Sequence, residues 1–393
     1  MPQYYSLPQP PQRILIINLR YLGDVLLMTP LLSALRRTYP EACIEVLVYR
    51  HCAEMLEGNP DIDRVLMTPP RPRAADYVAL ARQIVRRYDL AFSLQSGDRR
   101  LLYALLAAPI RVGFVPDRGE KSAWKRRYFQ AWTTHEAHRH IVQEMLALGE
   151  LIGVAPYWSV TPPCALHEPL DLDLPARYAV LHPYPQWRYK RWPLAHWLEV
   201  ARYLISLGIT PVFSGGPAAE EQAYLDAIMQ PLRDQALNIA GKVRLAQLTR
   251  IFGNSVLFIG PDTGITHLAA ASGAKVIALY GPTDPARWGP WPIGYQQSTN
   301  PYLTRGHQSI NNVYLLQGPG NCVPCQQEGC DRHRDSSSQC LDDLPVTAVK
   351  QAIQQMLTAR AVNAASRPAS KERRLSDVAP IWSSAESSYH AAF

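Results

Sequence analysis

Residues 13–37 read RILIINLRYLGDVLLMTPLLSALRR, and this stretch sets the fold class. The run from Ile14 to Leu19 is continuously apolar, as in a strand buried in a parallel sheet. A Gly-Asp pair follows, and Leu and Met then recur at helical spacing from Val25 to Tyr39. A strand, a glycine turn and a helix in this order form the opening unit of a doubly wound α/β domain.

The same alternation continues through the first half of the chain. Ile44–Val48 and Leu90–Leu94 have the pattern of further strands, and Ala74–Tyr88 that of an amphipathic helix. Arg139–Ile152 predicts a long closing helix. We therefore expect a first α/β domain over residues 1–160.

The pattern stops and then restarts in the second half. Residues 155–175 are rich in proline and lack periodicity, which places a linker at 161–176. A second domain is expected over 177–362, followed by a disordered Ser/Ala-rich tail at 363–393. Its predicted strands are Tyr178–His182, Thr210–Ser214, Val256–Ile259 and a last strand at Lys275–Tyr280, and its predicted helices include Leu194–Leu207, Glu220–Met229 and Leu245–Phe252. Two doubly wound sheets then face a cleft at the carboxyl ends of their strands.

Composition and charge narrow the function classes. The 393 residues carry a net charge of +7, but residues 1–175 hold 20 Lys and Arg against 18 Asp and Glu. Neither half is basic enough for a nucleic-acid footprint. The start has no signal-peptide pattern, and the apolar stretch Leu101–Ile110 is too short to span a membrane. We therefore expect a cytoplasmic protein.

The first chemical motif is Arg20-Tyr21-Leu22-Gly23-Asp24, at the end of the first predicted strand. Gly23 permits a tight turn and a close approach of the backbone to a ligand. Asp24 then lies at a helix start facing the cleft. It is interpreted either as a helix cap or as a catalytic base.

The second motif, Gly260 to His267, reads GPDTGITH between an apolar strand and an Ala-rich helix. The free N–H groups and positive dipole of such a helix start bind anions, and His267 lies one turn further in. An Asp cap with a buried His is the alternative interpretation of Asp262 and His267.

Two further segments follow strands of the second half. Lys190, within RYKRWP, is either a diphosphate ligand or part of a solvated charge run before a helix. Glu220 and Glu221 follow Gly215-Gly216-Pro217, where a carboxylate either binds ribose hydroxyls or favours the helix start electrostatically.

Together these segments resemble the lipopolysaccharide heptosyltransferases of glycosyltransferase family 9. The resemblance extends over residues 12–360. It is carried by three segments, Arg13–Arg37, Lys190–Pro193 and Gly260–Pro285. Finer features in 110–128 and 287–291 resemble the heptosyltransferase III branch. The resemblance implies a GT-B fold, an ADP-heptose donor, inversion at the anomeric carbon and no divalent metal.

The resemblance also implies roles for individual residues. Asp24 matches the general base, and Lys190 the lysine that holds the diphosphate. The donor motif is matched by Asp262, Thr263, Gly264 and His267. Gly23 is a further expected donor contact. The acid that binds the donor ribose is expected at Glu220 or Glu221. The expected reaction moves heptose onto the inner core oligosaccharide of lipopolysaccharide.

The acceptor implied by this resemblance is an anionic, lipid-linked oligosaccharide at the inner face of the inner membrane. The basic residues expected to bind this acceptor lie in the first half and are Arg99, Lys121, Lys125 and Arg126. Each of them taken alone is also interpretable as an ordinary surface cation.

Four of the seven cysteines fall within 19 residues, at Cys322, Cys325, Cys330 and Cys340. This density predicts either a structural zinc site or free thiols. The cluster lies outside the catalytic motifs, so it does not indicate metal catalysis.

The sequence lacks the motifs that other classes of function would require. The turn after the first strand has no G-x-G-x-x-G pattern, which an NAD-linked oxidoreductase needs. A non-catalytic nucleotide-sugar binding protein is expected to lose the base, but Asp24 is present. A family 9-like transferase that uses another nucleotide sugar or acceptor stays open as the alternative.

Overall fold

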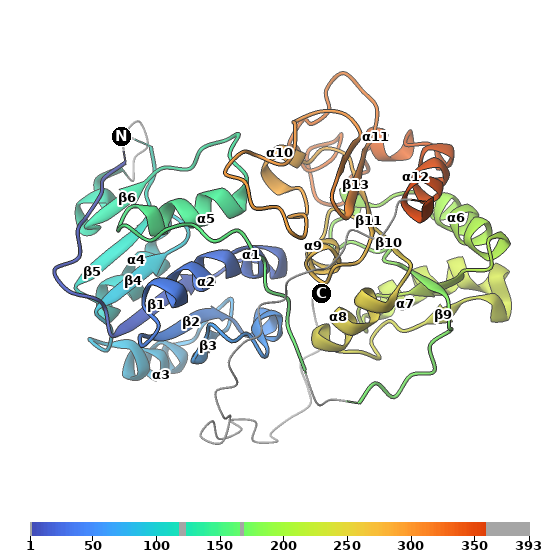
Figure 1. Ribbon diagram of the computed structural model, residues 1–393. Helices are drawn as coiled ribbons and strands as arrows, with labels where there is room; N and C mark the ends of the chain where they lie inside the picture. Colours follow the sequence, from blue (N-terminus) through green and yellow to red (C-terminus); the bar gives the residue numbers. More distant parts are fainter. Residues whose placement is uncertain (1, 118–122, 166–168, 359–393) are drawn as a thin grey trace.

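The computed structural model describes residues 2–117, 123–165 and 169–358 and contains two parallel sheets side by side (Figure 1). The predicted tail at 363–393 and Lys121 lie outside these residues. The first sheet has the order β3-β2-β1-β4-β5-β6, and all its pairings are parallel. Its strands are β1 (Arg13–Asn18), β2 (Cys43–Tyr49), β3 (Arg64–Thr68), β4 (Leu90–Ser93), β5 (Ile110–Phe114) and β6 (Ala131–Thr133).

Helices cover both faces of this sheet because alternate strand residues point to opposite sides. Ile14 and Ile16 of β1 pack in the cluster that contains the helices α1, α2 and α5, whereas Leu15 and Ile17 pack with α3 and α4. All four side chains are fully buried, each contributing about 1.5–3 kcal/mol. The helices are α1 (Leu22–Leu27), α2 (Thr29–Thr38), α3 (Ala74–Ile84), α4 (Asp98–Ala107) and α5 (Ile141–Glu150), with 3-10 turns η1 (Arg50–Leu56) and η2 (Ala123–Tyr128).

The second sheet has the order β12-β13-β11-β10-β7-β8-β9, and only β12 runs antiparallel to its neighbour. Its strands are β7 (Tyr178–Leu181), β8 (Thr210–Phe213), β9 (Leu237–Asn238), β10 (Leu257–Pro261), β11 (Val276–Tyr280), β12 (Gln308–Ile310) and β13 (Val313–Gln317). The helical segments are η3 (Arg188–Lys190), α6 (Leu194–Ser206), α7 (Ala219–Met229), η4 (Gln230–Gln235), α8 (Leu245–Asn254), α9 (Gly264–Ala271), α10 (Pro285–Trp288), α11 (Gln339–Asp342) and α12 (Val346–Thr358).

Two local predictions were wrong. The helix expected from Val25 to Tyr39 is two helices, because Pro30 in the first turn of α2 cannot donate to the carbonyl group of Leu26 and its ring clashes there. The Thr29 hydroxyl donates to that carbonyl instead, over 2.8 Å. The sheet also does not end at β11, since β13 pairs with β11 in parallel and β12 completes the edge.

The two sheets fall on either side of the predicted linker at 161–176, and its described residues contain no helix or strand. The halves are nevertheless joined by close packing. Helix α1 of the first half lies against α9 of the second, and the largest apolar cluster contains residues of both halves. No helix among the described residues is long and apolar enough to cross a bilayer.

Candidate active site

A cleft of about 940 Å³ lies between the halves. Its walls include the segments that follow the carboxyl ends of β1, β7, β8 and β10, as expected for doubly wound sheets. The first half supplies Asp24, and the second supplies Lys190, Asp262 and His267. The predicted base and the predicted donor motif therefore face the same cavity.

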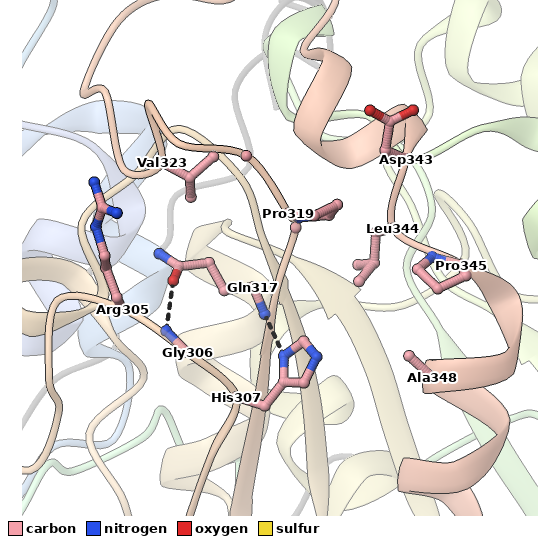
Figure 2. A pocket seen from close by; sticks show the side chains of 12 residues that line it. Arg305, Gly306, His307, Gln317, Pro319, Val323, Asp343, Leu344, Pro345 and Ala348 are labelled. Carbon is pink, nitrogen blue, oxygen red and sulfur yellow. Dashed lines mark hydrogen bonds between the residues drawn. The ribbon is translucent and has the colours of Figure 1, made fainter.

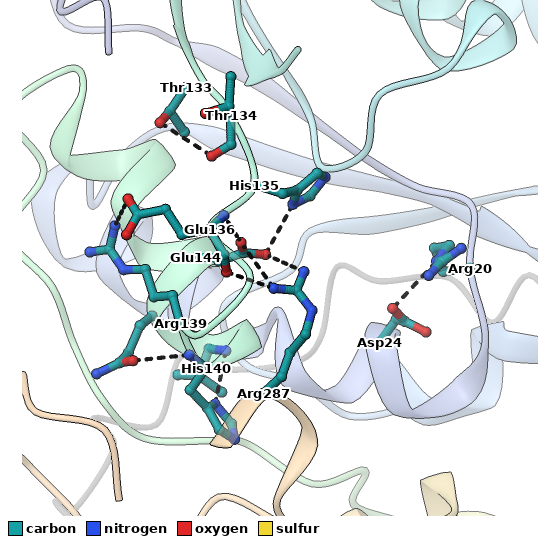
Figure 3. Close-up of polar contacts among 12 residues, drawn as sticks. Arg20, Asp24, Thr133, Thr134, His135, Glu136, Arg139, His140, Glu144 and Arg287 are labelled. Carbon is teal, nitrogen blue, oxygen red and sulfur yellow. Dashed lines mark hydrogen bonds and ion pairs between the residues drawn. The ribbon is translucent and has the colours of Figure 1, made fainter. Parts of the chain in front are cut away.

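Asp24 is the third residue of α1, and Tyr21 is the N-cap residue. The Asp24 carboxylate accepts from the backbone N–H of Tyr21, and its Oδ1 lies 3.5 Å from Nε of Arg20 (Figure 3). Burial raises the pKa of Asp24 above its ordinary value, although the Arg20 guanidinium opposes the shift. The carboxylate lines the cleft from the first turn of a helix and can accept a proton there, so the helix-start and cleft roles coexist.

Lys190 and Asp262 form an ion pair, with 2.5 Å between Nζ and Oδ2. Burial alone would lower the Lys190 pKa, but Asp262, together with Tyr189 and Asp24, outweighs burial and raises it. Burial would likewise raise the Asp262 pKa, but Lys190, together with His267 and Thr283, outweighs burial and lowers it. Both groups are therefore charged at neutral pH, and Lys190 is held at the cleft wall instead of extending into solvent.

Thr263, not Asp262, caps α9, because the Thr263 side chain accepts from the backbone N–H of Thr266. Asp262 is thus free of the capping role that the sequence left open. Thr283 and Tyr280 also hydrogen bond to its carboxylate. The start of α9 opens on the cleft with Thr263, Gly264 and Ile265 among the lining residues, which leaves its amides available to an anion.

His267 is buried in the first turn of α9, and burial lowers its pKa to about 4. The ring is therefore neutral at pH 7. Within the described part of the chain its Nδ1 has no hydrogen-bond partner, although the residue lines the cleft. A buried polar atom of this kind is costly unless a ligand or water satisfies it.

Gly23 and Gly264 meet where α1 approaches α9. A Cβ added to Gly264 would lie 2.9 Å from the backbone N of Gly23, and one added to Gly23 would lie 3.2 Å from Cδ2 of His267. Gly264 therefore requires glycine for this close approach of the two halves, whereas a Cβ at Gly23 would crowd the His267 ring. The contact brings Asp24, one residue after Gly23, next to the start of α9.

Glu221, and not Glu220, lines the cleft. Glu221 is buried, and burial raises its pKa against a hydrogen bond from the Gly216 backbone. A Cβ on Gly215 would lie 2.5 Å from the Glu221 carboxylate, so the glycine leaves room for it. Glu220 is 78% exposed and pairs with Arg191.

Three of the predicted acceptor residues are described, and their side chains form contacts outside the lining of the cleft. Lys125 pairs with Asp98, the Arg126 side chain donates to the Ala123 carbonyl, and Arg99 donates to the Pro70 carbonyl over 2.9 Å. None of these three basic residues is among the residues that line the described cleft.

Arg20 and Arg100 line the first-half wall instead. Burial lowers the Arg100 pKa, and the nearby Arg20 charge lowers it further. The Nε atom of Arg100 has no hydrogen-bond partner among the described residues. Arg20 belongs to the same motif as Asp24 and was identifiable from it. Arg100 comes from α4, and no sequence signal separates it from Arg99.

A second group of contacts joins the halves beside the cleft (Figure 3). Nη1 and Nη2 of Arg287, on α10, reach the two oxygens of Glu144 on α5 at 3.3 and 2.9 Å. His135 Nδ1 lies 3.0 Å from the Glu144 carboxylate. The backbone N–H of Glu136 donates to the same carboxylate over 2.7 Å. The group connects α5 to the segment around α10, whose preceding residues 282–284 line the cleft.

His140 adds a neutral contact across the same boundary. Its Nδ1 accepts from the Val142 N–H, so its Nε2 carries the proton and donates to the Gly289 carbonyl over 2.8 Å. Burial lowers the His140 pKa to about 3, which keeps this tautomer neutral.

The four clustered cysteines are free thiols in the structure. Burial raises the Cys340 pKa to about 12, and Cys325 and Cys330 are close enough to add to the shift. Across residues 2–117, 123–165 and 169–358, no three His, Cys, Asp or Glu side chains are arranged to hold a metal ion. The zinc site stays a prediction that metal analysis of the purified protein checks.

A smaller cavity of about 530 Å³ lies between the ends of β12 and β13 and the start of α12 (Figure 2). Its His307 Nδ1 accepts from the Gln317 backbone N–H, and the Gln317 side chain accepts from Gly306. The cavity contains none of the residues predicted for catalysis or donor binding. The larger cleft is therefore the candidate active site.

Known proteins share both the sequence and the architecture. A family model described as glycosyltransferase family 9 (heptosyltransferase) matches residues 77–313, which is more than half of the chain. The chain belongs to glycosyltransferase family 9. This family 9 enzyme is therefore a glycosyltransferase with an α/β GT-B fold.

Individual relatives of this family 9 member are heptosyltransferases by name. Lipopolysaccharide heptosyltransferase 3 of Escherichia coli K12 is 28% identical over 289 residues, which cover 70% of this chain and 83% of the relative. Among solved structures, E. coli heptosyltransferase WaaC with ADP aligns with a TM-score of 0.68 at 21% identity, covering 88% of this chain and 99% of that one. E. coli ADP-heptose heptosyltransferase II aligns with a TM-score of 0.66 at 20% identity, covering 88% and 98%.

Proposed function

We propose that this family 9 enzyme transfers heptose from ADP-heptose, with inversion, onto the inner core oligosaccharide of lipopolysaccharide. One observation carries the proposal: Asp24 of the first half and the Lys190–Asp262 pair of the second half line one cleft. The heptosyltransferase names of the relatives support the sugar and the acceptor class.

Asp24 acts as the general base in this proposal. The acceptor hydroxyl attacks the anomeric carbon from the face opposite the diphosphate, and its proton passes to the Asp24 carboxylate as the new C–O bond forms. The Arg20 charge lowers the Asp24 pKa and so opposes the rise that burial causes. A single displacement of this kind inverts the anomeric configuration.

Lys190 and the start of α9 take up the charge of the leaving ADP. The anomeric C–O bond breaks with its electron pair on the diphosphate, where Lys190 and the amides at the start of α9 stabilise it. Asp262 fixes Lys190 in place and keeps its pKa raised. Glu221 is the carboxylate positioned to accept hydrogen bonds from the donor ribose.

The acceptor occupies the first-half wall, which Arg20 and Arg100 make positive. An anionic core oligosaccharide suits these guanidinium groups, which bind carboxylate and phosphate in two-point geometry. Because such an acceptor is lipid-linked, we propose a cytoplasmic enzyme in peripheral contact with the inner face of the inner membrane.

Transfer from ADP-heptose to a heptose-bearing core acceptor, measured by mass spectrometry in the presence of EDTA, tests the proposal. We expect transfer by the native protein and a loss of about 10²–10⁴-fold with Asp24→Asn. Glu220→Gln, an exposed carboxylate outside the cleft lining, is the control and keeps full activity. No transfer from ADP-heptose, together with transfer from another nucleotide sugar, replaces the proposed donor by the alternative one.

A non-catalytic nucleotide-sugar binding protein is the second alternative. It predicts ADP-heptose binding by calorimetry without turnover in any acceptor mixture. The Asp24 position one residue from the contact with α9 argues against it, because a binding protein has no need for a buried carboxylate there.

A further inference from the structure

The positive charge of the chain is concentrated in one segment. Residues 67–128 hold 13 Lys and Arg against 5 Asp and Glu, which leaves 27 against 28 in the rest of the chain. Of the acidic residues that the structure describes there, Asp76 binds the α3 start, Asp89 binds the backbone of Arg13, and Asp98 pairs with Lys125. Thirteen cations against five anions leave this segment with a net charge of +8, whereas the rest of the chain is close to neutral.

The same segment exposes large apolar side chains. Of the twelve such side chains exposed in the described residues, eight fall between residues 67 and 128. They are Met67, Tyr77, Val78, Val85, Leu102, Leu105, Trp124 and Tyr128. Helix α3 buries only Leu80 and Ile84, so apolar residues also occupy the side that a solvent-exposed helix normally keeps polar.

These side chains lie on neighbouring elements. The backbone N–H of Arg86, just after α3, donates to the Leu106 carbonyl of α4 over 2.8 Å, and the rings of Tyr77 and Tyr103 lie 6.2 Å apart. The Lys125–Asp98 pair joins η2 to the start of α4. We call this surface, formed by α3, α4 and η2, the α3–α4 face; it belongs to the first half (Figure 1).

The α3–α4 face borders the acceptor wall of the cleft. Arg100, in the first turn of α4, and Pro70, just before α3, both line the cleft. Arg99 joins these two segments through its hydrogen bond to the Pro70 carbonyl. A substrate anchored in a layer against this face therefore reaches the cleft on the side of Asp24 and Arg100.

We propose that the α3–α4 face docks on an anionic lipid bilayer. The inference rests on the proposed function, because a lipid-linked acceptor must be taken from such a surface. Exposed arginines, including Arg71, Arg82 and Arg87, are attracted to anionic headgroups, while the aromatic and leucine side chains enter the interface. Aromatic residues such as Trp124 and Tyr128 favour the boundary between headgroups and acyl chains.

Sedimentation of the full chain with vesicles tests the docking directly. The vesicles contain phosphatidylcholine alone or mixed with phosphatidylglycerol. We expect binding to the anionic vesicles only, weakened by salt, and a loss of more than about tenfold in partitioning for the variant Arg82→Gln/Arg87→Gln/Leu102→Ser/Leu105→Ser. The control in the second half, Arg202→Gln/Leu303→Ser, removes one exposed arginine and one exposed leucine, half as many as the docking variant, and keeps native partitioning.

Transfer to a short water-soluble acceptor separates this inference from the proposed function. We expect the docking variant to keep native activity there and to lose activity on acceptor embedded in vesicles. Native partitioning of the docking variant, or no binding of the wild-type chain to anionic vesicles, overturns the docking proposal and leaves the transferase proposal intact. A wild-type dimer that the same variant converts to monomer, without vesicle binding, assigns the face to a second copy of the chain instead.

Discussion

Replacing Glu144 by glutamine removes a buried charge while keeping the size of the side chain. The Glu144 side chain is 1% exposed, and that of its partner Arg287 is 15% exposed. The variant leaves the guanidinium buried without a counter-charge. Removing one member of a buried pair costs about 3–5 kcal/mol, a large part of the about 5–15 kcal/mol that stabilises a typical domain.

Thermal unfolding followed by circular dichroism measures this cost. For a domain of 150–250 residues, the expected loss lowers Tm by roughly 6–20 °C. The double variant Glu144→Gln/Arg287→Met removes both charges and should recover most of the loss. Glu136→Gln is the control, since its partner Arg139 forms an exposed ion pair worth less than about 1 kcal/mol.

The pH dependence gives an independent check. Burial would raise the Glu144 pKa, but His135 and Arg287 together outweigh burial and hold the pKa below its ordinary value of 4.5. The ionised group therefore stabilises the fold fully above about pH 4.5, and this contribution is lost as pH falls through the lower folded-state pKa. The Tm difference between wild type and Glu144→Gln should shrink in acid. Equal Tm losses for Glu144→Gln and Glu136→Gln at pH 7 would refute the reasoning.

Three further predictions concern the cleft. Arg20→Gln removes the cation that lowers the Asp24 pKa, so the acid limb of the kcat/KM profile should move to higher pH; an unchanged limb means that Asp24 is not the titrating base. Lys190→Met should lower kcat by roughly 10²–10³-fold in single-turnover assays, whereas a change in KM alone contradicts a leaving-group role. Gly264→Ala places a Cβ 2.9 Å from the Gly23 backbone and should destabilise the closed arrangement by about 1–3 kcal/mol, seen as a lower Tm; native Tm and native kcat mean that the contact is dispensable.

The sequence predicted the architecture well because its periodicity reports burial. The apolar run in 14–19 became β1, and the motifs lie at strand ends as expected for doubly wound sheets. Asp24, Lys190 and Asp262 were expected to share a cleft, and the structure places them on one, because the carboxyl ends of parallel strands meet at one edge. Their roles remain predictions.

Other features depend on geometry that a sequence does not contain. Successive helix residues point about 100° apart, so the choice between Glu220 and Glu221 depends on where α7 begins, at Ala219. Lys125 looks like a free surface cation in sequence, but folding brings Asp98 to it from 27 positions away. The strand β12 has only three residues and carries too little periodicity to be separated from a loop.

The contact between Gly23 and Gly264 has a consequence for building chimeric enzymes. In the proposed function the acceptor wall comes from the first half and the donor motif from the second, so the two halves would set acceptor and donor preference separately. A recombinant that joins the first half of one family member to the second half of another keeps its chemistry only if both glycines and the Glu144–Arg287 pair match across the junction. Under that proposal, exchanging one half exchanges the preference for one substrate, provided that the contacts between the halves are kept.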